Sequence, residues 1–182
     1  SLDKIRDDLS QERKITFIDT PGHEAFAQLR SRGASVADIA ILVVAADDSV
    51  KPQTIESIKQ IQATGTSMVV AINKIDKEGA QVDKVKSDLA KNGVQLEGFG
   101  GDVPFQAVSA VKGTGIPDLL ELLLLVADMK GLTGDKKAPL SAVVIETRLD
   151  KSVGLVATVL IKEGTLTRGM QLYEFDESVC KV

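Results

Sequence analysis

Apolar and polar residues alternate in two different ways along this chain of 182 residues, and the first way covers residues 14–130. Here, short runs rich in Val, Ile and Ala have the length of buried strands, and longer stretches carry apolar side chains at helical spacing. The runs predict strands at residues 14–19, 39–46, 68–72 and 103–109. The stretches predict helices near residues 23–33, 52–65, 82–92 and 117–129. Because strands and helices alternate, we expect an α/β fold with a right-handed, doubly wound parallel sheet.

The pattern changes after Met129, where helical spacing stops. A polar linker at residues 131–139 leads to β-rich runs that are separated by turns containing glycine. These runs lie at residues 141–149, 155–162 and 170–175. We expect residues 140–182 to form the start of an antiparallel β-barrel, and the abrupt end of the pattern indicates that this barrel domain is truncated. Residues 1–13 are polar, and their few apolar side chains at helical spacing predict an N-terminal helix or tail.

Composition argues against a DNA-binding protein, a protein with internal disulfides and a membrane protein. The chain has 22 basic and 26 acidic side chains and no dense block of Lys or Arg, which argues against DNA as a partner. Cys180 is the only cysteine and His23 the only histidine, so the sequence offers neither an internal disulfide nor a Cys/His metal cluster. No apolar run is long enough to span a bilayer and no signal sequence opens the chain. A soluble protein without membrane association is therefore expected.

The first apolar run ends on Asp19, which is followed by Thr, Pro, Gly22 and His23. Ligands of parallel α/β sheets bind beyond the carboxyl ends of the strands, so this junction places a carboxylate and a flexible amide where a ligand would lie. Asp19 is suited to holding a hydrated Mg2+, and Gly22 to bringing its N–H close to a phosphate oxygen. The same residues also fit an ordinary turn that caps the next helix.

The motif Asn73-Lys74-Ile75-Asp76 follows a second strand. Asp76 can accept hydrogen bonds from N1–H and the exocyclic amine of guanine, a pair of donors that adenine lacks. The aliphatic part of Lys74 can cover the face of a base, and Asn73 can tie its loop to a neighbour. Taken alone, the motif also fits a plain surface turn.

Ser109-Ala110-Val111 ends a third strand. The N–H of Ala110 can bond the guanine O6, and the hydroxyl of Ser109 can brace the loop that carries Asp76. On its own this tripeptide has little specificity. Its order and spacing relative to the other two motifs make it informative.

Together, the three motifs resemble the GTP-binding domain of the translational GTPases. Further stretches are similar to the bacterial and organellar initiation factor 2 branch of that family, at residues 15–26, 30–34, 38–45, 48–54, 144–151 and 154–158. The resemblance covers about residues 14–175. It implies a P-loop GTPase-like sheet followed by the family's second, barrel domain. It also implies a GTPase that brings initiator tRNA to the small ribosomal subunit and promotes joining of the large one.

The resemblance also gives each motif residue a role. His23 would orient the attacking water during GTP hydrolysis, Asp19 would contact Mg2+ through water, and Gly22 would sense the γ-phosphate. The guanine of GTP or GDP would be held by residues of the other two motifs: Asn73, Lys74, Asp76, Ser109, Ala110 and Val111.

The sequence departs from the family in what it lacks. It contains no P-loop to cradle the phosphates, no switch threonine to complete the Mg2+ shell, and no strands before residue 14. We therefore expect a fragment whose partial G domain, residues 14–130, binds GTP weakly and does not hydrolyse it alone. Natural loss of nucleotide turnover is the alternative. Val111 stands where lysine is common in the family, which puts guanine affinity in doubt unless Lys112 compensates.

Two other functions stay open. One is a non-catalytic module, derived from such a GTPase, that docks on the ribosome or another partner. The other is a different tRNA-delivering translational GTPase, against which the stretch at residues 144–151 argues. Initiator tRNA itself would bind a domain beyond residue 182. The expected location is the bacterial cytoplasm, or the mitochondrial matrix or plastid stroma if the source is organellar.

Overall fold

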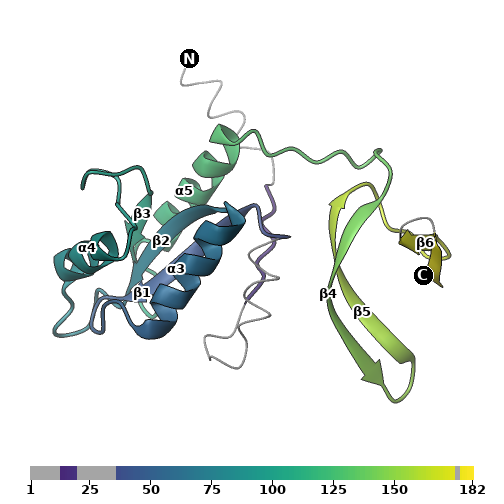
Figure 1. Cartoon of the computed structure of the whole chain (residues 1–182), viewed down its shortest axis with the longest axis horizontal. Helices are drawn as coiled ribbons and strands as arrows, with labels where there is room; N and C mark the ends of the chain where they lie inside the picture. The colour runs from purple at the N-terminus through teal and green to yellow at the C-terminus, as the bar shows by residue number, and fades with distance from the viewer. Residues whose placement is uncertain (1–12, 20–35, 175–176) are drawn as a thin grey trace.

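The structure, a computed structural model, describes residues 13–19, 36–174 and 177–182. Its first part is a parallel sheet of three strands in the order β1-β2-β3 (Figure 1). The strands are β1 (Ile39–Ala45), β2 (Ser67–Asn73) and β3 (Phe105–Ala107). The helices that follow them are α3 (Pro52–Thr64), α4 (Val82–Lys91) and α5 (Ile116–Met129). The predicted α/β class and the parallel sheet are confirmed.

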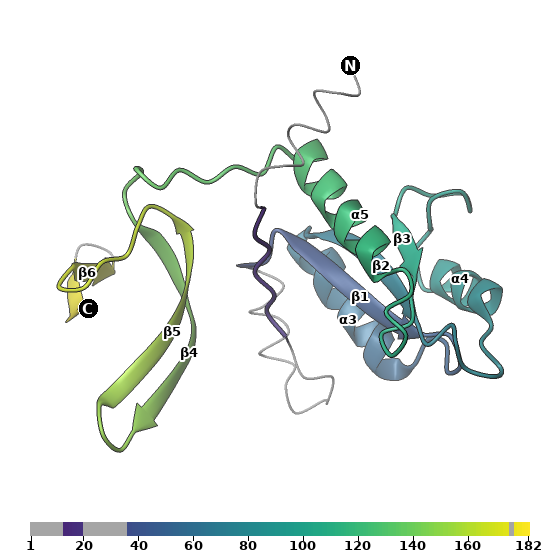
Figure 2. The ribbon, with the colours of Figure 1, turned by 180° about the vertical axis from the view of Figure 1, so that it is seen from behind.

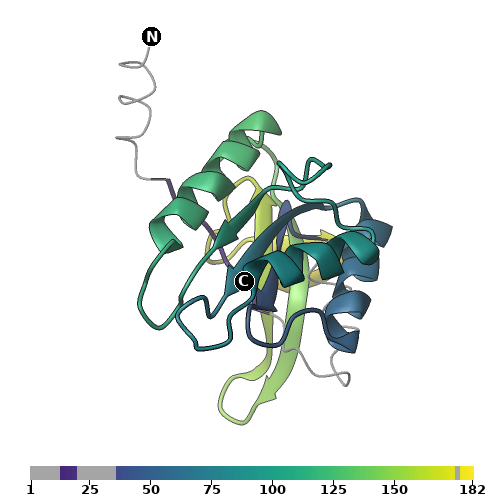
Figure 3. The same cartoon turned by 90° about the vertical axis from the view of Figure 1, so that its left-hand side faces the viewer.

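Helices α3 and α4 cover one face of the sheet and α5 covers the other, as Figure 2 and Figure 3 show. The core on the first face includes Leu42, Val44, Ile58, Ile61, Val70, Ile72, Val85 and Leu89. Residues 69–72 of the central strand β2 are at most 2% exposed, because helices cover both of its faces. In the outer strand β1, by contrast, Val43 points away from this core and is 59% exposed.

The prediction of a strand at residues 14–19 is wrong. Residues 13–19 have no regular secondary structure, and the side chains of Ile15 and Phe17 are 39% and 61% exposed. A strand is stabilised by its ladder, and none of the strands in the described residues pairs with this run. The run is held at its start instead, where Arg13 Nη1 donates to both carboxylate oxygens of Asp128 at 2.8 and 2.9 Å.

Strand β3 is shorter than the predicted strand at residues 103–109. It pairs with β2 only over residues 105–107. Proline has no N–H to donate, so Pro104 interrupts the ladder on the N-terminal side. Beyond the ends of β3, single backbone bonds still reach β2, from Val70 N to Pro104 O at 2.9 Å and from Val108 N to Ile72 O at 2.8 Å. Isolated bridges join Val103 to Leu96 and Ser109 to Thr114.

Beyond α5 lie two antiparallel hairpins. They consist of β4 (Ser141–Asp150) with β5 (Gly154–Glu163), and β6 (Gln171–Glu174) with β7 (Glu177–Lys181). No ladder joins one hairpin to the other within the described part of the chain. The antiparallel strands are confirmed, and the described strands do not close into a barrel. Closing a barrel requires a partner on both sides of every strand, and each of these strands has one.

The linker expected at residues 131–139 is bonded at both ends. Leu132 N donates to a carbonyl of α5 at 3.1 Å, and Gly164 N donates to Asp135 O at 2.9 Å. Gly164 has a φ of +78°, and a Cβ there would lie 2.7 Å from linker backbone. Glycine therefore permits the close approach between the linker and the end of the first hairpin.

Lys162 of β5 connects the first hairpin to the chain just before β1. Its Nζ lies 2.7 Å from Asp38 Oδ1 and 2.9 Å from Val36 O. The side chains of Lys162 and Asp38 are 32% and 58% exposed, so water screens the ion pair and its own contribution to stability is small.

Several predicted features lie outside the described residues. These are the helix at residues 23–33, the helix or tail at 1–13 apart from residue 13, and both Gly22 and His23. Among the helices that are described, none combines the length and apolar character needed to cross a membrane.

Candidate functional site

The loop after β2 reverses direction within a few residues. Asn73 is the last residue of the strand, and Lys74 follows in the left-handed region with a φ of 66°. That conformation is uncommon for a residue with a Cβ. It is supported here because Lys74 N donates to Asn73 Oδ1 at 2.7 Å and Lys77 N donates to Lys74 O at 3.1 Å. The side chain of Asn73 thus stabilises the turn that presents Asp76.

Asn73 also ties this loop to the loop after β3. The same oxygen, Oδ1, accepts a hydrogen bond from Ala110 N at 3.0 Å. Val108 N donates to Ile72 O at 2.8 Å, and Ile75 N donates to Val108 O at 3.3 Å. Backbone and side-chain bonds therefore hold the carboxyl ends of two neighbouring parallel strands together, at the edge where such sheets bind ligands.

Ser109 braces both loops from inside. Its side chain is fully buried, its Oγ accepts from Lys112 N at 3.1 Å, and its N–H donates to Thr114 O at 2.9 Å. The hydroxyl donates to the Asp76 carboxylate, and this bond is the main reason why the pKa of Asp76 lies below its usual value. The charges of Lys112 and Lys77 act in the same direction. Asp76 is thus an exposed and ionised acceptor at neutral pH.

The structure gives a protein partner to the N–H of Ala110, which the sequence leads us to expect at a guanine O6. This N–H donates to Asn73 Oδ1. The reason is that the Asn73 amide oxygen lies between the two loops and accepts from both of them. Val111, the next residue after Ala110, has 91% of its surface accessible.

Asp47 is a member of this edge that the sequence analysis missed as a site residue. It lies just beyond β1, 2.9 Å from Lys77 Nζ through Oδ2 and 3.4 Å from Lys74 Nζ through Oδ1. The hydrogen bond with Lys77 is the main cause that lowers the pKa of Asp47 and raises the pKa of Lys77. A carboxylate after an apolar run was the available signal, because the same signal marks Asp19 and Asp76.

Of the residues expected on the phosphate side, the structure describes Asp19. Asp19 is exposed, and within the residues described no hydrogen bond or ion pair links it to either loop. The same residues hold no group of three or more His, Cys, Asp or Glu side chains arranged for a metal. A lone carboxylate fits Mg2+ that is held through water and phosphate oxygens, since Mg2+ keeps several waters and needs few protein ligands.

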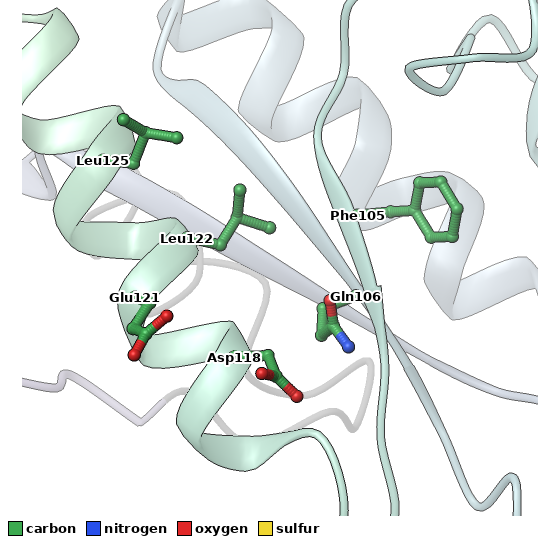
Figure 4. Close-up of a pocket in the computed structure, with 6 residues that line it drawn as sticks. All are labelled: Phe105, Gln106, Asp118, Glu121, Leu122 and Leu125. Carbon is green, nitrogen blue, oxygen red and sulfur yellow. The ribbon is translucent and has the colours of Figure 1, made fainter.

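An open pocket of about 390 Å3 lies between β3 and α5 (Figure 4). Its lining residues are Phe105, Gln106, Asp118, Glu121, Leu122 and Leu125. Figure 4 shows the four α5 side chains on one side of it, while Phe105 points away from that helix. No residue of the loops at 73–76 or 109–111 lines this pocket, so it is not the predicted guanine site.

Comparison with known families divides the chain in two. Residues 3–128 match the family described as the elongation factor Tu GTP binding domain. Residues 139–182 match elongation factor G domain 2. Translation initiation factor IF-2 of Carboxydothermus hydrogenoformans is 57% identical to this chain over 157 residues. That stretch is 86% of this chain and 19% of the relative, so the chain spans about a fifth of the length of the relative it matches.

Two solved structures of translation factors have a fold similar to that of this chain. The GDP-bound aIF5B from Aeropyrum pernix has a TM-score of 0.60 and 28% identity, covering 88% of this chain and 34% of its own. The elongation factor SelB from Methanococcus maripaludis, in complex with the GTP analogue GppNHp, has a TM-score of 0.64. It is 21% identical and covers 90% of this chain and 39% of its own, so it supports the fold alone.

Proposed function

This chain belongs to the translational GTPase family, as a homologue of initiation factor IF-2, and from that premise we propose that its loops at residues 73–76 and 109–111 bind the guanine of GTP or GDP. One observation carries the proposal. Asn73 and Ser109 join two strand ends and leave the ionised carboxylate of Asp76 exposed between them. An ionised carboxylate with two acceptor oxygens suits the paired N1–H and amine donors of guanine.

The proposed roles follow from the contacts of each residue. Asp76 would accept both guanine donors, and the aliphatic part of Lys74 would lie against the base. Asn73 and Ser109 would hold the loops. Guanine O6 would share the Ala110 N–H with Asn73 as a three-centre bond, or accept from the N–H of Val111, a residue that is 91% exposed.

The phosphate side of the proposal rests on the family. Asp19 would hold Mg2+ through water, Gly22 would sense the γ-phosphate, and His23 would orient the attacking water. Mg2+ would neutralise charge on the phosphate oxygens. Phosphoryl transfer depends mainly on positioning and charge stabilisation, so a water-orienting role for His23 needs no strong base.

The proposal assigns the chain to part of an initiation factor that promotes initiator tRNA placement and ribosomal subunit joining. Residues 14–130 would be a partial G domain, 131–139 a linker, and 140–182 the beginning of the second domain, with 1–13 a helix or tail. The ribosome would be the partner, and initiator tRNA would bind a part of the factor outside this chain. The cell compartment would be that of translation, in a bacterium or an organelle.

Isothermal titration of this chain with GTP and Mg2+, alongside a phosphate-release assay, tests the proposal. We expect weak binding of GTP without hydrolysis. Asp76→Asn turns one acceptor oxygen into a donor, and we expect it to weaken GTP binding by at least about tenfold, the scale of one charged hydrogen bond.

Asp83→Asn is the matched control, because it makes the same charge change at a side chain that is 94% exposed on α4. It should leave GTP affinity unchanged. Equal affinity for ATP and GTP, or an Asp76→Asn variant that binds GTP as the parent does, would refute guanine recognition. Robust phosphate release by the unmodified chain would instead refute the expectation that it is inactive alone.

A further inference from the structure

The residues beyond β1 reach across to the loop after β2 and hold it at two places. Ala46 N donates to Asn73 O at 2.8 Å, and Gln81 N donates to Ala46 O at 2.9 Å. Ala46 is 3% exposed, so these bonds lie inside the fold. The loop that carries Asp76 therefore begins and ends on the same short segment after β1.

Asp47, the next residue along, contacts the middle of that loop. Its Oδ2 lies 2.9 Å from Lys77 Nζ and its Oδ1 lies 3.4 Å from Lys74 Nζ. The carboxylate is 21% exposed, whereas the side chains of Lys74 and Lys77 are 40% and 54% exposed. Because the shared partner is the more buried group, the two ion pairs are less screened than a pair on the open surface.

The loop needs such a contact. Lys74 has a left-handed backbone, and two ammonium groups on one short loop repel each other. Asn73 holds the loop on the side of Ala110. Within the described residues, Asp47 is the group that neutralises both lysines on the opposite side. Asp76 lies between Lys74 and Lys77 in the sequence, so its direction depends on where these two residues are held.

We propose that Asp47 is a positioning residue for guanine recognition, which fixes Lys74 and Lys77 and thereby aims the Asp76 carboxylate at both guanine donors. This inference rests on the proposed function, since it assigns a role in the same site. Asp47 itself does not contact the base. It acts on selectivity because both donors are met only when the carboxylate has the correct orientation.

Selectivity between guanine and hypoxanthine reports this orientation. Hypoxanthine has the N1–H but lacks the exocyclic amine, so a misdirected Asp76 loses part of the guanine advantage. A general loss of stability would weaken binding of both bases alike. The ratio of the affinities for GDP and IDP therefore separates positioning from folding.

The experiment follows backbone amide shifts of the whole chain by NMR as GDP or IDP is added with Mg2+, a method suited to weak binding. Asp47→Asn should weaken GDP binding by about three- to tenfold, the combined scale of two partly screened ion pairs, and should reduce the GDP:IDP affinity ratio by about threefold. Lys77→Met should cause about half of the loss in GDP-binding free energy that Asp47→Asn causes. In the double variant, the total loss should be smaller than the sum of the two separate losses, because both substitutions remove the same ion pair.

Asp48→Asn is the matched control. It removes the same charge one residue away, from a carboxylate that forms an ion pair with Lys51 at 3.2 Å and acts on Lys77 only through its charge, with no ion pair to the loop. It should leave the GDP:IDP ratio unchanged. An unchanged ratio in Asp47→Asn, or an equal change in Asp48→Asn, overturns the positioning role. If the unmodified chain discriminates neither GDP nor IDP from ADP, guanine recognition itself fails, which is a different outcome.

Discussion

Replacing Asn73 by alanine should separate the two loops of the site. The side-chain oxygen accepts from Lys74 N at 2.7 Å and from Ala110 N at 3.0 Å, and alanine accepts from neither. One hydrogen bond contributes a net stability of about 0.5–1.5 kcal/mol, so two give about 1–3 kcal/mol. Because Ala110 is exposed, water can replace one of them, and we expect Asn73→Ala to lower the free energy of unfolding by about 1–2 kcal/mol.

Urea unfolding measures this change in stability, and amide hydrogen exchange locates it. The Lys74 and Ala110 amides should exchange faster in Asn73→Ala. Asn73→Asp should retain much of their protection, because it keeps an acceptor oxygen in the same place. Asn92→Ala is the control, since it removes one amide hydrogen bond, to Asp88 O at 2.8 Å, from the end of α4.

The reasoning fails if Asn73→Ala leaves both the unfolding free energy and the exchange of Ala110 unchanged. It fails equally if Asn92→Ala accelerates exchange at Lys74 and Ala110, because the effect would then be global. Neither result depends on nucleotide, so this prediction tests the architecture of the site separately from its proposed ligand.

Two further predictions concern the buried residues beneath the site. Ser109→Ala removes the hydrogen bond that most lowers the pKa of Asp76, so this pKa should rise toward 3.8 in a carbon-detected NMR titration, and an unchanged pKa would refute the assignment. In the unmodified protein, the lowered pKa of Asp76 contributes to the free energy of unfolding. This contribution is fully present above pH 3.8 and is lost as the pH falls through the pKa of Asp76 in the folded state. Ser109→Ala should remove this contribution. Ile72→Ala should lower the unfolding free energy by about 2–5 kcal/mol, because Ile72 is 0% exposed between two helix-covered faces. Val111→Ala, at a residue that is 91% exposed, should change it by less than about 0.5 kcal/mol, and similar urea midpoints for the two variants would contradict the burial argument.

The sheet was largely predictable because its central strands are long apolar runs with clear ends. The predicted strands at residues 39–46 and 68–72 agree with β1 and β2 to within one residue at each end. The run at residues 14–19 has the same apolar character, yet it forms no strand. An apolar run shows that a segment can pair, but the available partner is a property of the whole fold. Likewise, the short length of β3 depends on Pro104, which has no N–H to donate, and on the neighbouring loop.

The site was predictable where it depends on strand ends and unpredictable where it depends on side-chain partners. The sheet brings the Asn73 and Ser109 loops to one edge, as the order of strands implies. The ion pairs of Asp47 join residues 27 and 30 positions apart, and no local pattern specifies them. The sequence indicates that Asn73 ties its loop to a neighbour, but it does not identify the Ala110 N–H as the donor, since that depends on the distance between two loops.

The bonded ends of the linker have a mechanical consequence. Leu132 is fixed to α5 and Asp135 to Gly164, so three peptide units span the distance between the two anchors. At full extension they reach only about 10 Å. Because this part of the linker is so short, the effective concentration of the first hairpin near the start of β1 is on the order of millimolar. The Lys162–Asp38 ion pair, which is too exposed to join separate molecules, can therefore form repeatedly within one chain and limit how far the hairpin swings.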